Sequence, residues 1–268
     1  MKSVLSIAGS DSSGGAGIQA DIKTVEAHHL FAQTAITALT AQNTTGVYGV
    51  LDVPADFVAK QIDVVFDDIR PDAVKVGMVS SPSIVEAIAD ALVRNNARNI
   101  VVDPVMVATS GSELATSDAV VALKEKLIPL ATVITPNIPE AEALFGTAIA
   151  DENDQELAAL GIAASTGVST LVKGGHREDE ANDVLVMPNG KTVWFKGPRI
   201  ETPNTHGTGC TLSSAIACGL AVGFSLEQSV DAAKRYVAGA LEEGLDLGKG
   251  SGPIDHMWHF DWDGSESE

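Results

Sequence analysis

Cysteine is scarce in this sequence, with only Cys210 and Cys218 among 268 residues. The two cysteines fall on one predicted helix, where eight positions correspond to about 12 Å of helical rise. That separation is too long for a disulfide, so two free thiols and a reducing, cytoplasmic setting are expected. Cys218 lies on the apolar stripe of this helix and is predicted to be a core residue.

Basic residues and long apolar runs are also few. Lysine and arginine total 17 against 36 acidic residues, which gives a formal net charge of −19. This balance argues against nonspecific binding to nucleic acid or to anionic membranes, both of which require a basic patch. No run approaches the roughly 18–20 apolar residues of a membrane helix, and the N-terminus reads as a first strand rather than a signal peptide. The acidic surface has two interpretations, ordinary solubility or adaptation to a salty cytoplasm, which a stability series in potassium chloride would distinguish.

Several catalytic motifs are missing from the chain. A Walker A sequence, a clean GxGxxG, HExxH, CxxC and GxSxG are all absent, which disfavours P-loop, Rossmann and common zinc or serine-hydrolase sites. The tail segment HMWHFDWD contains His256, His259 and Asp261, which could bind a metal. Packing is the preferred interpretation of these residues, because they lie beside an acidic chain end.

Short apolar segments alternate with longer amphipathic ones along the chain. Segments that are apolar throughout are typical of strands buried on both faces of a parallel sheet. Such strands are predicted at residues 4–9, 34–42, 73–79, 99–106, 132–137 and 169–175, with an edge hairpin at 183–187 and 192–195. Helices are predicted at residues 17–28, 56–69, 83–95, 118–130, 139–145, 155–167, 210–222 and 226–243.

This alternation predicts an α/β fold, a three-layer α/β/α sandwich with a mostly parallel central sheet. Residues 1–260 are predicted to form a single domain and residues 261–268 an acidic C-terminal tail. Ligands of such sheets bind beyond the carboxyl ends of the strands. The segments that follow the predicted strands are rich in small, polar and charged residues, so one active-site rim built from several loops is expected.

The stretch NTHGTGC, residues 204–210, precedes an apolar helical pattern. Small residues leave backbone N–H groups accessible, and a helix N-terminus favours negative charge, so an anion site is predicted here. Cys210 at this helix start is expected to have a depressed pKa. The thiol could be a nucleophile, a base or a small buried residue.

Acidic and cationic residues follow three neighbouring predicted strands. Asp103 in DPV and Glu140 in NIPE, together with Asn137, suit magnesium held through water and nucleotide phosphates. Lys173 in VKGGH could offer a cation to phosphate. The alternatives are a turn residue for Asp103, a first-turn helix acid for Glu140 and a surface lysine for Lys173.

Other polar and apolar residues near predicted strand ends could surround a small ring. Asp21 and Gln42 could hydrogen-bond a heteroaromatic ring, and Met78 could supply an apolar face. Lys75 sits inside an apolar run, so it must lie at a strand end or be paired.

With these residues in view, the chain resembles the hydroxymethylpyrimidine and phosphomethylpyrimidine kinases of thiamine biosynthesis, within the ribokinase-like superfamily. The resemblance runs from about residue 3 to residue 258. The motifs that carry it are SIAGSDSSGGAGIQADIKT, TALTAQNTTGV, KVGMV, VVDPVMVATSG, ITPNIPEAE, LVKGGH, NTHGTGCTLSSAIA and GKGSGPIDH. The resemblance implies that ATP phosphorylates 4-amino-5-hydroxymethyl-2-methylpyrimidine, first to the monophosphate and then to the diphosphate. It also implies Mg²⁺ and a homodimer.

The resemblance further implies a role for each matching position. The pyrimidine would be surrounded by Gly9, Asp21, Gln42, Met78 and Val105. Asp103 and Glu140 would be the magnesium-associated acids. Positions near the ATP phosphates would be Asn137, Lys173, Thr208 and Lys234. Gly207 and Gly209 would form the anion hole, and Cys210 would accept or orient the proton of the substrate hydroxymethyl group.

Three rival functions stay open on the sequence. A pyridoxine or pyridoxal kinase of vitamin B6 salvage would use a similar small ring with a hydroxymethyl group. A cysteine acyl transferase would use Cys210 as nucleophile and His206 as base. A non-catalytic pyrimidine sensor would need no magnesium acids, which disfavours it.

Overall fold

The computed structural model describes residues 1–106, 116–175 and 181–260. The expected acidic tail at residues 261–268 therefore lies outside the described residues, as do Asp261, His176 and the end of the VVDPVMVATSG motif. Across the described ranges, no helix is long and apolar enough to cross a membrane.

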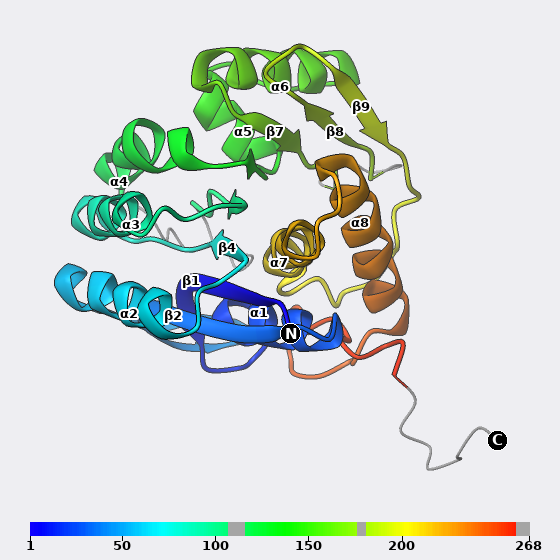
Figure 1. Ribbon diagram of the computed structural model, residues 1–268. Coiled ribbons are helices and arrows are strands. Elements are labelled where there is room, and N and C mark those ends of the chain that lie inside the picture. The colour runs from blue at the N-terminus through cyan, green and yellow to red at the C-terminus, as the bar shows by residue number, and fades with distance from the viewer. Residues whose placement is uncertain (107–115, 176–180, 261–268) are drawn as a thin grey trace.

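One sheet of nine strands runs through the described part of the molecule (Figure 1). Its spatial order is β3-β2-β1-β4-β5-β6-β7-β8-β9. The strands are β1 (Ser3–Asp11), β2 (Phe31–Asn43), β3 (Gly46–Asp52), β4 (Ala73–Val76), β5 (Ile100–Val102), β6 (Val133–Ile134), β7 (Ser169–Val172), β8 (Asp183–Val186) and β9 (Thr192–Phe195). In this spatial order, the six neighbouring strands β2, β1, β4, β5, β6 and β7 pair in parallel. Antiparallel strands flank them, β3 at one edge and β8 and β9 at the other.

Helices cover both faces of the sheet, so the predicted three-layer α/β/α sandwich is confirmed. They are α1 (Gly17–Ala27), α2 (Ala55–Asp68), α3 (Pro82–Arg94), α4 (Ser117–Ala122), α5 (Ile138–Phe145), α6 (Glu152–Thr166), α7 (Thr208–Ala221) and α8 (Leu226–Glu243). One apolar core packs α2, α3, α4 and α6 against the sheet, and a second packs α1, α7 and α8 against the opposite face. Helix α7 lies beside the middle strands with α8 outside it (Figure 1), and eleven of its residues are buried.

Two local features differ from the sequence-based prediction. Strand β3 was not predicted, because five of its seven residues are exposed and it therefore lacks a buried apolar run. The helix predicted at residues 118–130 is broken into α4, a π-helical turn at Leu123–Leu127 and a 3₁₀ turn at Ile128–Leu130. Pro129 within that last turn has no N–H for a regular helical hydrogen bond, which accounts for the tightened end.

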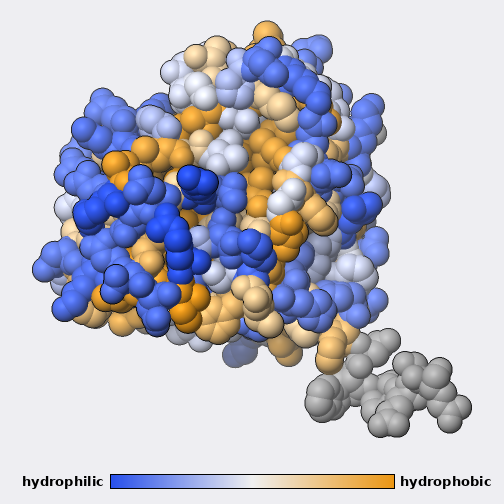
Figure 2. Space-filling model, viewed as in Figure 1, coloured by the Kyte–Doolittle hydropathy of each residue, from blue (hydrophilic) through white to orange (hydrophobic). Residues whose placement is uncertain are grey.

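The surface seen in Figure 2 is largely hydrophilic, with smaller apolar areas between. The exposed large apolar side chains include several on the β2–β3 edge, namely Leu39, Tyr48, Val50 and Leu51. A sheet edge with such residues is open to pairing or packing with another surface.

Candidate active site

A cavity of about 1580 Å³ lies at the carboxyl ends of the parallel strands. It extends from residues at the end of β1 to residues of β9 and α8. Five strand spacings separate β1 from β8, or about 24 Å at ~4.8 Å per strand, so the cavity can hold an elongated ligand or two ligands side by side. Thirteen of the fourteen predicted site residues line it: Gly9, Gln42, Met78, Asp103, Val105, Asn137, Glu140, Lys173, Gly207, Thr208, Gly209, Cys210 and Lys234.

The first turn of α7 lines this cavity with Gly207, Thr208, Gly209 and Cys210. Gly207 is the N-cap residue, with φ of 89°, and no side chain caps the helix. The first N–H groups of a helix have no intrahelical partner, so without a capping side chain they are available to a ligand. The first turn also has no acidic residue, so no side chain of the helix itself offsets its partial positive charge. A helix start of this kind is suited to an anion, and the anion site stays a prediction.

A buried ion pair faces this helix start. Lys173 Nζ donates to Asp103 Oδ1 at 2.9 Å, and Thr135 Oγ1 donates to the same oxygen at 2.9 Å. A Cβ atom built at Gly209 would lie 3.5 Å from both Asp103 Oδ2 and Lys173 Nζ. The absence of a side chain at Gly209 thus lets the helix start approach the pair. Burial opposes the charge on Lys173, but Asp103 and Glu140 outweigh it and raise the pKa of Lys173.

Glu140 and Asn137 form a capping box at the start of α5. Asn137 N–H donates to Glu140 Oε2 at 2.8 Å, and Glu140 N–H donates to Asn137 Oδ1 at 2.9 Å. The first-turn acid interpretation of Glu140 is therefore correct, and Glu140 still lines the cavity. Burial raises the pKa of Glu140 to about 7, although Lys173 opposes this and Asp103 adds to it.

Two carboxylates, Asp103 and Glu140, thus border the cavity near one lysine. Among the described residues, no group of three or more His, Cys, Asp or Glu side chains could hold a metal ion by itself. Mg²⁺ typically takes one or two protein carboxylates and completes its shell with water and substrate phosphates. The residues present therefore fit magnesium that arrives with a nucleotide, and do not form an all-protein metal cage.

The other end of the cavity lies at the switch in strand order between β1 and β4, where open α/β sheets bind ligands. A Cβ at Gly9 would be 3.1 Å from Met78 Sδ, so the missing side chain leaves room beside the thioether. Gln42 Oε1 accepts a hydrogen bond from Thr40 Oγ1 at 3.1 Å. Gln42 also lines the cavity.

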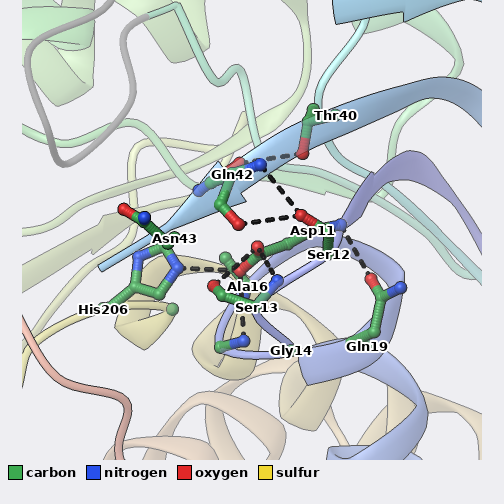
Figure 3. Close-up of polar contacts among 12 residues, drawn as sticks. Asp11, Ser12, Ser13, Gly14, Ala16, Gln19, Thr40, Gln42, Asn43 and His206 are labelled. Atoms are coloured by element: carbon green, nitrogen blue, oxygen red, sulfur yellow. Dashed lines mark hydrogen bonds and ion pairs between the residues drawn. The ribbon is translucent and has the colours of Figure 1, made fainter. Parts of the chain in front are cut away.

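Asp11 is a site residue that the sequence analysis missed (Figure 3). Its carboxylate accepts hydrogen bonds from Ser13 N–H and Oγ, from Gly15 N–H and from Ala16 N–H, at 2.7–3.1 Å. His206 Nε2 contacts Asp11 Oδ2 at 2.8 Å, which joins the loop after β1 to the loop before α7. Burial alone would raise the pKa of Asp11, but the hydrogen bonds from His206 and Ser13 lower it well below its usual range. An Asp followed by Ser and Gly at a strand end is the signal that could have predicted this turn.

The position of His206 also bears on the acyl-transferase alternative. That alternative required His206 to be the base of Cys210, whereas the ring nitrogen Nε2 is engaged with the buried Asp11 carboxylate. Near the C-terminus, His256 Nε2 contacts Thr211 Oγ1 at 3.0 Å and His259 Nε2 contacts Ala27 O at 3.3 Å. These two histidines take part in packing, as expected.

Asp21 differs from its prediction. It does not line the cavity but is fully buried beneath it, where Lys75 Nζ donates to both carboxylate oxygens at 2.8 and 2.9 Å. A direct hydrogen bond from Asp21 to a substrate ring is therefore incompatible with its position. The same contact confirms that Lys75 is paired.

Lys234 lines the cavity as predicted, but its ammonium group is already engaged. Lys234 Nζ donates to Asp183 Oδ2 at 2.7 Å and to the carbonyl oxygen of Ala181. A phosphate near Lys234 would therefore share its charge with Asp183.

Both cysteines are free, and Cys218 is buried in the core as predicted. The expectation of a depressed pKa for Cys210 was wrong. Burial raises the pKa of the Cys210 thiol to about 11, because it outweighs the positive charge of Lys75, while Asp21 and Asp103 raise the pKa further. The thiol is therefore neutral near pH 7 in the free protein, which suits a hydrogen-bonding group better than a general base.

We expect this raised pKa to be visible in alkylation kinetics. The rate at which iodoacetamide modifies Cys210 should keep rising with pH toward about 11, because only the thiolate reacts. Mass spectrometry of digested protein would follow Cys210 separately from the buried Cys218. A rate that levels off below pH 8 would contradict the assignment of a neutral thiol.

Comparisons with known proteins agree with this geometry. The family model of phosphomethylpyrimidine kinase matches residues 11–255. The hydroxymethylpyrimidine/phosphomethylpyrimidine kinase of Rhizobium meliloti is 50% identical, over 96% of this chain and 97% of that protein. The corresponding protein of Escherichia coli is 44% identical, over 96% of this chain and 98% of its own length.

Solved structures are similar over the same length. The phosphomethylpyrimidine kinase of Clostridium difficile has a TM-score of 0.79 and 45% identity, over 90% of this chain and all of the other. A pyridoxal kinase of Bacillus subtilis in complex with ADP has a TM-score of 0.87 and 35% identity, over 96% of this chain and 97% of the other. With the match across nearly the whole chain and the site described above, this chain belongs to the phosphomethylpyrimidine kinase family.

Proposed function

We propose that this protein transfers the γ-phosphoryl group of ATP to 4-amino-5-hydroxymethyl-2-methylpyrimidine, and then to the resulting monophosphate, in thiamine diphosphate biosynthesis. The observation that carries this proposal is the uncapped start of α7 facing the Asp103–Lys173 pair inside one long cavity. Phosphoryl transfer needs mainly positioning and stabilisation of charge, which these groups supply.

The pyrimidine is assigned to the part of the cavity between β1 and β4. Gly9, Met78 and Val105 offer a small apolar slot, and Gln42 presents its amide nitrogen to a ring atom. The opposite part of the cavity, near β9 and α8, suits the nucleotide base because it contains apolar side chains. These are Pro198, Ile200, Val237, Ala238 and Leu241.

Charge on the transferred phosphoryl group would be met by the backbone N–H groups of Gly209 and Cys210 and by Lys173. Asp103 and Glu140 would hold Mg²⁺, which supplies neutralisation of phosphate charge when bound with the nucleotide. Asn137 and Thr208 stay assigned to the vicinity of the phosphates. With a neutral thiol, Cys210 orients the substrate hydroxyl rather than deprotonating it.

A second activity is supported by a specific observation, the close likeness to pyridoxal kinases. Besides the Bacillus structure, a pyridoxal kinase of Staphylococcus aureus in complex with AMP-PCP and pyridoxal has a TM-score of 0.88 and 33% identity over 97% of this chain. Pyridoxal also carries a hydroxymethyl group on a small ring. We therefore include it as a candidate second substrate.

A homodimer and a cytoplasmic location are part of the proposal. The exposed apolar residues of the β2–β3 edge, such as Tyr48 and Leu51, support a second copy as partner, since an unpaired edge is readily covered. The absence of a disulfide among the two cysteines supports a reducing compartment.

The test is an ATP-consumption assay with magnesium, in which hydroxymethylpyrimidine, its monophosphate and pyridoxal are offered in parallel at low and high potassium chloride. We expect turnover of both pyrimidines. Turnover of pyridoxal alone would move the protein to vitamin B6 salvage. No ATP consumption with any of the three would overturn the proposed kinase activity, and the salt series reads out the meaning of the acidic surface.

A further inference from the structure

A fully buried ion pair lies beneath the proposed transfer site. Lys75 and Asp21 both have side-chain exposure of 0%, and their charged atoms are 2.8 Å apart. Ser6 Oγ donates to Asp21 Oδ2 at 2.5 Å and Ser214 Oγ donates to Asp21 Oδ1 at 2.7 Å. Burying two charges carries a desolvation cost that their attraction often fails to recover, so stability alone is a weak reason for this pair.

The elements that carry the pair also carry Cys210 and its neighbour. Asp21 comes four residues after Gly17 on α1, and Ser214 comes four residues after Cys210 on α7, so each lies one helical turn below its counterpart on the same face. At the upper level, the Cys210 sulfur accepts a hydrogen bond from the Gly17 backbone. At the lower level, Ser214 is bonded to Asp21.

The sheet supplies the third side of this arrangement. Ser6 of β1 and Lys75 of β4 are direct partners in the parallel register, so both face Asp21 from adjacent strands. Helix α7 lies alongside these two strands (Figure 1). The ion pair is thus bonded to α1, α7, β1 and β4 at one point, directly under the first turn of α7.

Gly77 keeps room for the ammonium group. A Cβ atom at Gly77 would lie 2.7 Å from Lys75 Nζ and 3.2 Å from Ala8 Cβ. A larger residue at this position would displace the ammonium group from its contacts with Asp21. This accounts physically for the glycine in the KVGMV segment.

The charged groups that face Cys210 come from two elements, β4 and α1, and from the segments that follow β5 and β7. Lys75 on β4 supplies positive charge, and Asp21 on α1 and Asp103 after β5 supply negative charge. Lys173 after β7 also interacts with Cys210. Of these, Lys75 and Asp21 are the pair held away from solvent, where electrostatic interactions are strong.

We propose that Asp21 and Lys75 form a positioning pair, which fixes the first turn of α7 and holds the Lys75 ammonium group behind Cys210 and the phosphoryl group being transferred. Asp21 holds Lys75 in place, Ser214 ties the pair to α7, and neither charged residue touches substrate. This inference rests on the proposed kinase function and adds two positioning residues to it.

The first test compares kcat and KM of wild type with those of Gly77→Ala and of the double variant Asp21→Asn/Lys75→Met. The double variant removes both charges, so no unpaired charge is left in the interior. Gly77→Ala keeps both charges and displaces the Lys75 ammonium group. We expect kcat to fall by at least about 10-fold in both, because small misplacements near a reacting centre have large effects on rate. The KM values for ATP and for the pyrimidine should stay within about 3-fold, because the pair contacts neither ligand.

Two matched controls accompany these variants. Gly49→Ala on β3 should leave kcat unchanged, since its Cβ would meet only Ala41 Cβ at 3.8 Å. Asp63→Asn on α2 breaks an exposed ion pair with Arg94 on α3 and should also leave kcat unchanged. Wild-type kcat in Gly77→Ala and in the folded double variant would overturn the proposal.

The second test needs no substrate and separates this inference from the kinase assignment. At pH 8, Asp21→Asn should speed alkylation of Cys210, because Lys75 then lacks its neutralising partner, and Lys75→Met should slow it. Cys218 is buried, so its rapid alkylation marks a variant that has lost its fold. If the charge variants do not fold, Gly77→Ala tests the proposal through its kcat. If wild type consumes no ATP, the rate of Cys210 alkylation in Gly77→Ala is measured instead. Alkylation of Cys210 that shifts in the same direction in both folded single variants, or that changes in neither, would overturn the positioning role.

Discussion

Substituting Gly207→Ala is expected to reduce kcat by at least about 100-fold, a loss comparable to that of an anion-hole donor. Gly207 has φ of 89°, which an L residue adopts only under strain, and a Cβ there would lie 1.9 Å from the carbonyl oxygen of Gly15. The Cβ is fixed to the backbone of α7 and the atom that it meets is backbone, so relief requires the loop after β1 and the start of α7 to separate. This would also disturb the Asp11–His206 contact that joins those loops. Steady-state kinetics with saturating ATP measures the loss.

Gly223 offers a control with the same backbone strain and no clash. Its φ is 90°, and a Cβ there would meet nothing within 4 Å. Gly223→Ala should therefore show the strain alone, of roughly 1 kcal/mol, or about 2–4 °C in Tm, with kcat unchanged. Equal kinetic effects of the two substitutions would mean that the close approach of Gly207 to Gly15 has no catalytic importance.

Replacing Lys173 with methionine is expected to lower kcat by about 10²–10³-fold with little change in the KM for the pyrimidine. The Lys173 side chain is 14% exposed, and its ammonium group lies next to Gly209 in the first turn of α7. The group stays charged because neighbouring acids raise its pKa. Its removal takes away a cation beside the proposed phosphoryl position. It also leaves the buried Asp103 carboxylate without its cationic partner, although Thr135 still donates to it, so a loss of a few kcal/mol of stability should accompany the kinetic effect.

Lys191→Met is the matched control, because Lys191 pairs with Glu227 at the exposed surface. An exposed ion pair contributes at most about 1 kcal/mol, so both kcat and Tm should be nearly unchanged. Thermal unfolding of each variant separates lost stability from lost catalysis. If Lys173→Met keeps wild-type kcat, its role in charge stabilisation is wrong, and the anion site is formed by the α7 backbone alone.

The sequence alone was enough for the layers and for thirteen of the residues that line the cavity. Parallel strands buried on both faces have apolar runs that stand out from amphipathic helices, and loops after such strands converge at one edge of the sheet. This is why thirteen residues predicted from loops and from the family resemblance line a single cavity. Strand β3 escaped prediction because it is exposed, and exposed edge strands carry little periodic signal.

Only the tertiary structure decided how charges are partnered. Asp21 and Lys75 are 54 positions apart, and Asp11 and His206 are 195 apart, so no local pattern indicates that they meet. The protonation of Cys210 is decided in the same way. A helix N-terminus lowers a thiol pKa and is readable from the sequence, whereas burial, which raises it to about 11, depends on everything packed around the sulfur. The strands, the helices and the polar segments at strand ends were thus readable from local sequence, whereas the order of the strands and the electrostatics of the site were decided by three-dimensional packing.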